Sequence, residues 1–88
     1  MTESQSIDFG EITPEELAEA SRYQIVITWS DEDRVFIAEV PELPGVMTHG
    51  NTLAEAAEMA AESAALWLSA ARHLGHPIPE PTALLRSA

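Results

Sequence analysis

The sequence contains no cysteine, no lysine and no long apolar run. Without cysteine, the chain forms no disulfide bond and offers no thiolate to a metal ion. No apolar stretch approaches the roughly 18 residues that a helix needs to span a bilayer. The first residues have neither a basic flank nor an apolar segment, so they predict no signal peptide and no anchor. These absences favour a cytoplasmic protein.

The charge is strongly unbalanced, with 15 acidic residues against four arginines and a formal net charge of −11. Such a surface repels phosphate backbones, so we expect no direct contact with nucleic acid. It would attract a basic protein and accelerate the encounter with it. The same acidity can also serve solubility alone. With 88 residues the chain has room for one domain with a modest core, and such domains commonly gain stability from oligomers or partners.

The first structural signal lies in an N-terminal extension, residues 1–22. Thr13 is a favourable N-cap residue, and Pro14 suits the first position of a helix. Glu16 follows the cap by three residues and completes a capping box. The sequence therefore predicts a short helix from Pro14 to about Ser21, which must dock on the rest of the domain to persist.

Three stretches with strand character follow, at residues 23–29, 35–40 and 46–49. A short acidic turn joins the first two, so they are expected to form an antiparallel hairpin. The motif P-E-L-P-G at residues 41–45 breaks the pairing, because its prolines impose a stiff corner and Gly45 supplies a backbone conformation that other residues resist. The sequence thus predicts a three-stranded antiparallel sheet.

The hydrophobic pattern also predicts a register for the hairpin. With Trp29 opposite Arg34, Ile27 lies opposite Phe36, and one face of the hairpin is almost wholly apolar. The other face is mixed and contains Gln24, Val26, Thr28, Val35, Ile37 and Glu39. A slip of one residue would scatter the apolar side chains over both faces, so this register is preferred.

A long helix is predicted from Leu53 to about Leu74. Thr52 and Glu55 form a second capping box at its start, and Gly75 stands where a C-terminal cap belongs. One apolar stripe at helical spacing is expected to pack on the sheet: Leu53, Ala57, Ala60, Ala64, Trp67, Leu68, Ala71 and Leu74. The expected fold is therefore α+β, with a three-stranded antiparallel sheet (β-β-β-α) packed on one long helix and a short N-terminal helix.

A proline-rich segment, residues 76–81, is expected to leave the long helix in an extended conformation. The sequence therefore divides into an N-terminal extension at residues 1–22, a core domain at residues 23–81 and a C-terminal tail at residues 82–88. The apolar residues of the tail indicate a last helical turn.

Few side chains are placed to converge on a reaction centre. Asp31, Glu32 and Asp33 are adjacent, which indicates a solvated turn, because two-metal sites collect carboxylates from separate elements. His73 and His76 have an H-x-x-H spacing but lack the glutamate or cysteine partners of zinc motifs. No serine has an evident base, and no glycine-rich phosphate loop occurs. We predict no catalytic residue, no cofactor and no metal site, and hence no enzyme.

Four residues are candidates for contact with a partner protein: His49, Glu58, Glu62 and Trp29. His49 ends the third strand, and the alternative is a structural role with its ring bonded to nearby backbone. Trp29 is expected to be an anchor in the core or at an interface. Glu58 and Glu62 are acids on the long helix, and reversing their charge should slow capture of a basic partner if they lie at the contact.

Three motifs follow one another along the core domain. The second strand ends in P-x-L-P-G at Pro41, G-x-T-x-x-E-A starts at Gly50, and G-x-x-I-P-x-P starts at Gly75. In this order and at these intervals they resemble the HicB family of antitoxins, especially its stand-alone HicB-like domains. The resemblance covers the run from Tyr23 to Pro81.

The resemblance implies a β-β-β-α core like a partial RNase H fold. It also implies a partner, a small basic toxin resembling HicA that cleaves messenger RNA and that the antitoxin masks. Family members often self-associate, so the resemblance implies a homo-oligomer, a dimer or a tetramer. The net charge of −11 agrees with a basic partner, because a toxin that binds RNA must be basic where it works.

The sequence departs from the family pattern at its end. Many HicB antitoxins carry a C-terminal DNA-binding module, whereas only seven residues follow Pro81, so we expect no DNA binding. The acids that RNase H-like nucleases use are missing, and the fold alone would not establish nuclease activity. Two alternatives to an antitoxin stay open: a stand-alone homo-oligomeric structural or regulatory domain without a toxin, and a small-molecule or metal-binding domain.

Overall fold

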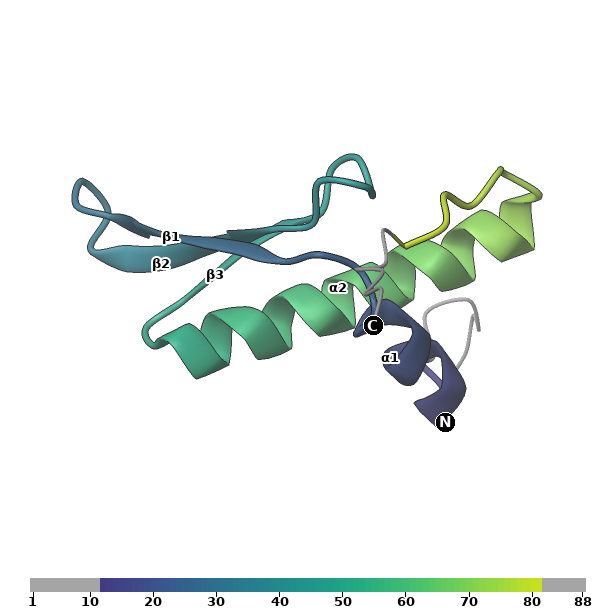
Figure 1. Cartoon of the computed structure of the whole chain (residues 1–88), viewed down its shortest axis with the longest axis horizontal. Coiled ribbons are helices and arrows are strands. Elements are labelled where there is room, and N and C mark those ends of the chain that lie inside the picture. Colours follow the sequence, from purple (N-terminus) through teal and green to yellow (C-terminus); the bar gives the residue numbers. More distant parts are fainter. Residues whose placement is uncertain (1–11, 82–88) are drawn as a thin grey trace, which may run out of the picture.

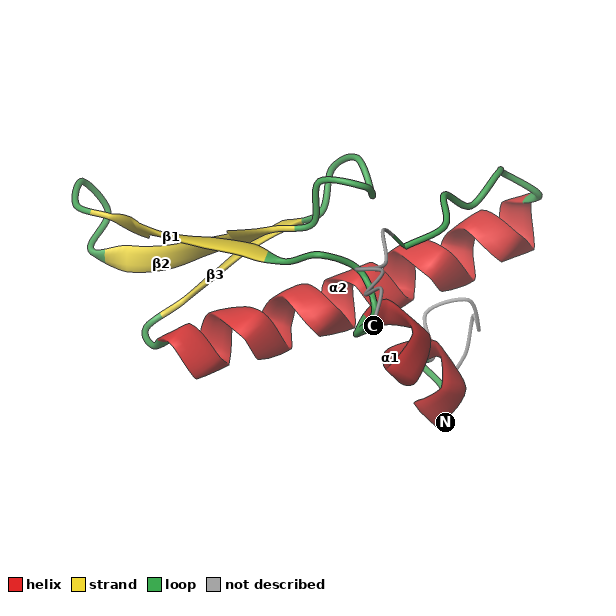
Figure 2. Ribbon diagram, viewed as in Figure 1, coloured by secondary structure: helices red, strands yellow, loops and turns green. Residues whose placement is uncertain are grey.

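The computed structural model describes residues 12–81. In chain order its elements are α1 (Pro14–Ala20), β1 (Val26–Ser30), β2 (Val35–Glu39), β3 (Met47–Gly50) and α2 (Leu53–Leu74). The strands form one antiparallel sheet in the order β1-β2-β3, and α2 lies along one face of it (Figure 1 and Figure 2). The predicted α+β fold is confirmed. The helical turn predicted in the tail, residues 82–88, lies outside the described residues.

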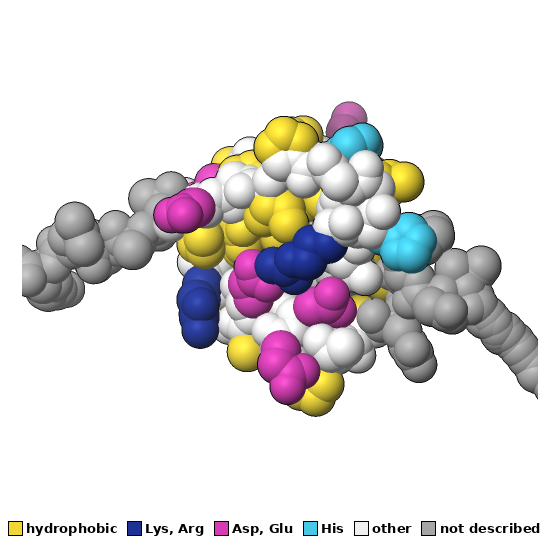
Figure 3. Space-filling model, turned by 90° about the vertical axis from the view of Figure 1, so that its right-hand side faces the viewer, with side chains coloured by type: hydrophobic (Ala, Val, Ile, Leu, Met, Phe, Trp, Pro, Cys, Tyr) yellow, Lys and Arg dark blue, Asp and Glu magenta, His cyan; other side chains and the backbone are white. Residues whose placement is uncertain are grey.

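The capping box predicted at Thr13 is present. Glu16 N–H donates to Thr13 Oγ1 at 3.1 Å, and Thr13 N–H donates to Glu16 Oε1 at 3.2 Å. α1 ends at the fully buried Ala20 and docks on α2, where Arg72 Nη2 donates to both carboxylate oxygens of Glu19 at 2.7 Å. Figure 3, which faces this end of the molecule, shows basic and acidic side chains side by side. Tertiary contacts therefore hold a helix that is too short to persist alone.

The hairpin register differs from the predicted one by two residues. Trp29 lies opposite Phe36, where Arg34 was expected, and Ile27 lies opposite Ala38. Side chains alternate between the two faces of a strand, so a shift of two residues leaves each side chain on its predicted face. The predicted register is wrong, while the division of the hairpin into an apolar and a mixed face is confirmed.

The turn between β1 and β2 explains the shifted register. Ser30 pairs with Val35, and Arg34 N–H donates to the Ser30 carbonyl at 2.7 Å. Arg34 has a φ of 59°, in the left-handed region, so it belongs to the turn and not to β2. The Ser30 hydroxyl also accepts Asp33 N–H at 3.2 Å, which ties the turn to the end of β1. The loop thus starts one residue later than the hydrophobic pattern indicated.

The core lies between the sheet and α2. Alanines line much of the helix face that is turned toward the sheet, and their small side chains let the helix approach closely. Leu68 and Leu43 are fully buried and are the largest side chains enclosed there. The buried core comprises Ala20, Tyr23, Ala38, Val40, Leu43, Val46, Ala56, Ala60, Ala64, Ala65 and Leu68.

Two leucines of the predicted helical stripe are exposed. Leu53 is 57% exposed and Leu74 is 63% exposed, so their assignment to the buried stripe was wrong. With its 22 residues, α2 spans about 33 Å. A five-residue strand covers only about 17 Å, and the helix extends beyond the sheet at its C-terminal end (Figure 1). Leu53 lies in the first turn of α2, where residues 52–55 are all exposed. Ala56 takes the fully buried position near the helix start, while Ala57 is only partly buried.

The start of α2 is packed tightly against the end of β3. Thr52 Oγ1 accepts Glu55 N–H at 3.0 Å, which confirms the predicted cap. The Glu55 carboxylate reaches one residue further back than predicted and accepts Asn51 N–H at 2.5 Å. A Cβ at Gly50 would lie 2.6 Å from the Ala56 backbone nitrogen. This distance is too short for a non-bonded contact, so any larger residue would force the backbone of β3 or α2 to move. Glycine therefore lets the strand and the helix meet closely.

The proline corner and the proline-rich segment are both attached to the body of the domain. Trp67 Nε1 donates to the Pro44 carbonyl at 3.1 Å, and the Tyr23 hydroxyl donates to the Pro79 carbonyl. Gly75 has a φ of 74° and caps α2 as predicted. These contacts fix the course of the chain on both sides of the long helix.

Candidate partner-binding surface

The sheet has a second face, turned away from α2, which we call the outer face. Strand alternation and the observed register place on it Val26, Thr28, Ser30, Val35, Ile37, Glu39, Met47 and His49. Four of these eight side chains are apolar, and Met47 is 60% exposed. Within residues 12–81, no helix or strand lies over this face (Figure 1). An uncovered sheet face with several exposed apolar side chains among polar ones is a candidate interaction surface.

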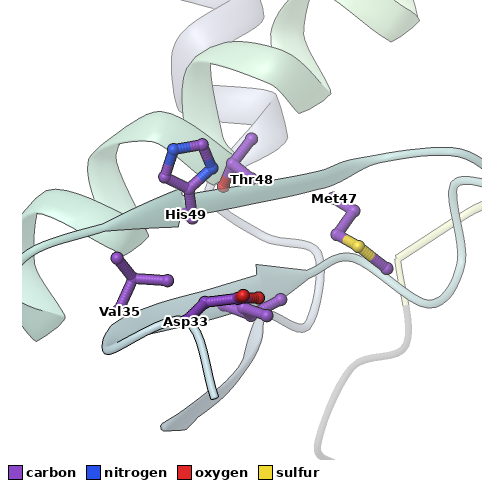
Figure 4. Close-up of a pocket in the computed structure, with 6 residues that line it drawn as sticks. Asp33, Val35, Met47, Thr48 and His49 are labelled. Atoms are coloured by element: carbon purple, nitrogen blue, oxygen red, sulfur yellow. The ribbon is translucent and has the colours of Figure 1, made fainter. Parts of the chain in front are cut away.

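The outer face is hollowed beside β3. A shallow depression of about 390 Å³ is lined by Asp33, Val35, Ile37, Met47, Thr48 and His49. Figure 4 shows Asp33 and Val35 from the hairpin together with Met47, Thr48 and His49 from β3. A neighbouring depression of about 340 Å³ is lined by Val35, His49, Gly50, Asn51, Glu55 and Met59. Both depressions share Val35 and His49, which places His49 between them.

His49 is the predicted site residue that lies on this surface. It sits on β3 opposite Ile37 and is exposed. In the described part of the chain, its ring makes no hydrogen bond to the backbone, so the alternative structural role finds no support there. Its position beside an apolar depression is compatible with contact to a partner.

Trp29 lies on the other side of the sheet. Its ring packs edge-on against Phe36 with 5.0 Å between centroids, and the Arg34 guanidinium lies 5.9 Å from the ring centroid. Trp29 Nε1 donates to Asp31 Oδ1 at 3.4 Å, and the side chain is 44% exposed. Trp29 is therefore a partly exposed anchor at the hairpin end, separate from His49.

Glu58 and Glu62 form a third location. Both are exposed on α2 and lie one helical turn apart, so they share one side of the helix. The four predicted residues therefore do not converge on one site: His49 belongs to the outer face, Trp29 to the inner face, and the two glutamates to α2.

The residues with perturbed pKa values lie away from the outer face. Burial of the phenol raises the pKa of Tyr23, and the nearby Glu19 carboxylate raises it further. Hydrogen bonding to Glu19 raises the pKa of Arg72 and holds the guanidinium charged. Arg72 joins α2 to α1 through Glu19, and the Tyr23 hydroxyl donates to the Pro79 carbonyl, so both groups make contacts that hold the fold together, although perturbed pKa values often mark functional sites.

Residues 12–81 contain no group of three or more histidine, aspartate or glutamate side chains arranged to hold a metal ion. In the same range, no helix has both the length and the apolar character that crossing a membrane demands.

Comparison with known families gives one result. The family model of the HicB-like antitoxins of bacterial toxin–antitoxin systems matches residues 23–87. The chain belongs to the HicB-like antitoxin family. The resemblance inferred from the three sequence motifs is thus confirmed. Neither the curated proteins nor the solved structures contain a match.

Within this HicB-like domain, sequence reasoning missed the residues that surround His49. Val35 and Ile37 were assigned to the mixed face, and nothing marked that face as uncovered. Met47 and His49 are two residues apart on one strand, which places them on the same face. That spacing, together with the Val35–Ile37 pair, is the signal that could have located the surface.

Proposed function

We propose that this chain is an antitoxin that binds and masks a small, basic, HicA-like toxin that cleaves messenger RNA. Membership of the HicB-like antitoxin family carries this proposal. The antitoxin acts by covering the toxin, not by catalysis, and it acts in the cytoplasm. The resemblance implies that its β-β-β-α core is a partial RNase H-like fold.

The charge of the chain supports a basic partner. A formal net charge of −11 repels RNA and attracts a protein whose surface is built to bind RNA. Long-range attraction accelerates the encounter, and it weakens as salt screens the charges. An antitoxin that captures its toxin early benefits from both properties.

The test is co-expression of the chain with the protein encoded by the neighbouring reading frame, followed by size-exclusion chromatography. We expect a stable complex, and we expect the purified chain to stop RNA cleavage by that toxin in proportion to the amount added. An unrelated acidic protein of similar size and net charge serves as the control. RNA cleavage that continues at full rate with excess chain would refute the proposal.

A second candidate function is a stand-alone homo-oligomeric structural or regulatory domain. It is favoured by the outer edges of β1 and β3, which pair with no strand within residues 12–81. Such edges accept a strand from a second copy by β-augmentation. The same chromatography separates the two functions, because a dimer or tetramer that ignores the toxin would favour this second one.

A further inference from the structure

The central strand carries a charge pattern on its outer side. Val35, Ile37 and Glu39 alternate with inward-facing side chains along β2, so an acid follows two apolar side chains on the outer side. Asp33 lies in the turn before β2, where its carboxylate accepts the Ser30 hydroxyl at 3.5 Å, and it lines the depression beside Val35. Together these side chains form a row with an acid near each end. Among residues 12–81, the ion pairs involve other acids, namely Asp31, Glu16 and Glu19.

The neighbouring strands add two apolar and two polar side chains beside this row. Val26 and Met47 flank Glu39 on β1 and β3, while Thr28 and His49 flank Ile37. Three strands at a spacing of about 4.8 Å are about 10 Å wide between their outer axes. A helix with its side chains is about 10–12 Å across, so the face accepts one helix lying along β2. Val35, Ile37 and Met47 line the depression and supply the apolar side chains on which such a helix would pack.

We propose that the outer face is the docking site for a basic amphipathic helix of the toxin partner. Apolar side chains of that helix pack on Val35, Ile37 and Met47, while its lysines or arginines reach Asp33 and Glu39. A helix on this face would complete a three-layer arrangement, with the sheet between two helical layers. The inference rests on the proposed function, because it takes the partner to be a basic protein.

The charges favour a basic helix over a second copy of the chain. A second copy also carries a net charge of −11, and two outer faces brought together would oppose their own acidic rows. Glu58 and Glu62 also have apolar neighbours on α2, because Met59 is 45% exposed and Leu66 is 39% exposed. The outer face differs in having a depression lined by Val35, Ile37 and Met47, in which apolar side chains of a helix can be buried beside Asp33.

The first test maps the surface without any toxin. The probe is a synthetic amphipathic helix of about 14 residues with leucine on one side and lysine on the other, matched by a peptide in which glutamate replaces every lysine. In NMR spectra of the full chain, we expect the lysine peptide to shift the signals of Val35, Ile37, Glu39 and Met47, and the glutamate peptide to leave them unchanged. Shifts confined to α2, or no shifts at millimolar peptide, would overturn the proposal.

The same spectra decide between other occupants of the face. Concentration-dependent shifts of these residues without peptide would show that a second copy occupies the face. Appearance of these shifts on deletion of residues 82–88, again without peptide, would show that the chain covers the face itself. Either result would overturn docking of a foreign helix.

The second test uses the toxin and a matched pair of variants. Met47→Lys places a positive charge on the outer face, and Leu74→Lys makes the same charge change at a side chain of similar exposure, 60% against 63%. We expect Met47→Lys to weaken toxin binding about 30-fold or more, as at an interface hot spot, and Leu74→Lys to weaken it less than about threefold. Circular dichroism confirms that both variants fold.

The outcomes of the two tests separate the inference from the proposed function. Equal binding by Met47→Lys and the original chain would refute the outer face as the toxin site, even though the antitoxin function stands. Failure of the original chain to bind any neighbouring toxin would refute the proposed function, while the peptide mapping still decides whether the face takes a basic helix.

Discussion

The two faces of the sheet differ in what covers them. The inner face packs on α2, and its Ala38 is fully buried. The outer face carries Val35 and Ile37 on the same strand, yet its Met47 stays 60% exposed. In a two-layer domain the face away from the helix is normally polar. The comparison teaches that the inner face stabilises the fold, whereas the apolar side chains of the mixed outer face have no packing partner among residues 12–81 and are available to the partner proposed above.

The largest effect is expected on the inner side. Leu68→Ala removes a fully buried side chain and leaves a cavity, so we expect a loss of about 2–5 kcal/mol in the free energy of unfolding. Urea denaturation followed by circular dichroism measures it. Leu53→Ala is the matched control, because Leu53 is exposed and its truncation should cost less than about 0.5 kcal/mol. Equal losses at the two leucines would contradict the assigned helix face.

A smaller effect is expected at the edge of the core. Tyr23→Phe deletes the hydrogen bond to the Pro79 carbonyl, which should cost about 1 kcal/mol in unfolding free energy. The raised pKa of Tyr23 also gives a pH dependence. The folded state keeps this proton longer than the unfolded state does, so the contribution is fully present below pH ~10 and is lost as pH rises through the folded pKa.

Denaturation of the original chain and of Tyr23→Phe at a series of pH values measures this dependence. The original chain should lose more stability than the variant as the pH rises above about 10. Parallel curves for the two proteins would show that the phenol titrates alike in the folded and unfolded chain, against the burial described here.

A substitution on the outer face should reduce toxin binding more than stability, whereas a substitution on the inner face should mainly reduce stability. Ile37→Thr keeps a β-branched side chain on a strand and replaces apolar surface with a hydroxyl, so we expect a stability loss below about 1 kcal/mol. Binding of the toxin should fall clearly in the same variant, as isothermal titration calorimetry would measure. A large loss of stability without any loss of binding would assign Ile37 to the core and contradict the division of the sheet into a stabilising face and a binding face.

The smallest effect is expected at the contact between α1 and α2. Arg72→Met keeps the apolar stem and removes the ion pairs to Glu19 and Glu16. The Arg72 side chain is 45% exposed, so solvent screens these pairs and the loss should be about 0.5 kcal/mol. Thermal unfolding at low and high salt measures it, and the difference between the proteins should shrink at high salt.

Much of the fold could be predicted because its signals are local. The caps at Thr13 and Thr52 depend on residues within one turn, and both were found from spacing alone. The hairpin register could not be obtained in the same way, since a period of two does not distinguish a shift of two residues. The left-handed conformation of Arg34 decided it, and a non-glycine residue gives little sequence signal for that conformation.

The candidate site was harder to predict than the fold. His49 was found, but the residues around it look like ordinary strand residues, and only the arrangement of layers shows that their face is uncovered. Leu74 failed for a related reason, because the apolar period continues past the point where the sheet ends. Periodicity reports which side of an element is apolar, and the lengths of the packed elements decide how much of that side is buried.

The close contact of Gly50 with the backbone of Ala56 has a mechanical consequence. Because β3 and α2 are in close contact at Gly50, a rotation of the sheet away from α2 is disfavoured. A partner would therefore meet a surface that is already in its bound shape, and little conformational freedom would be lost on association.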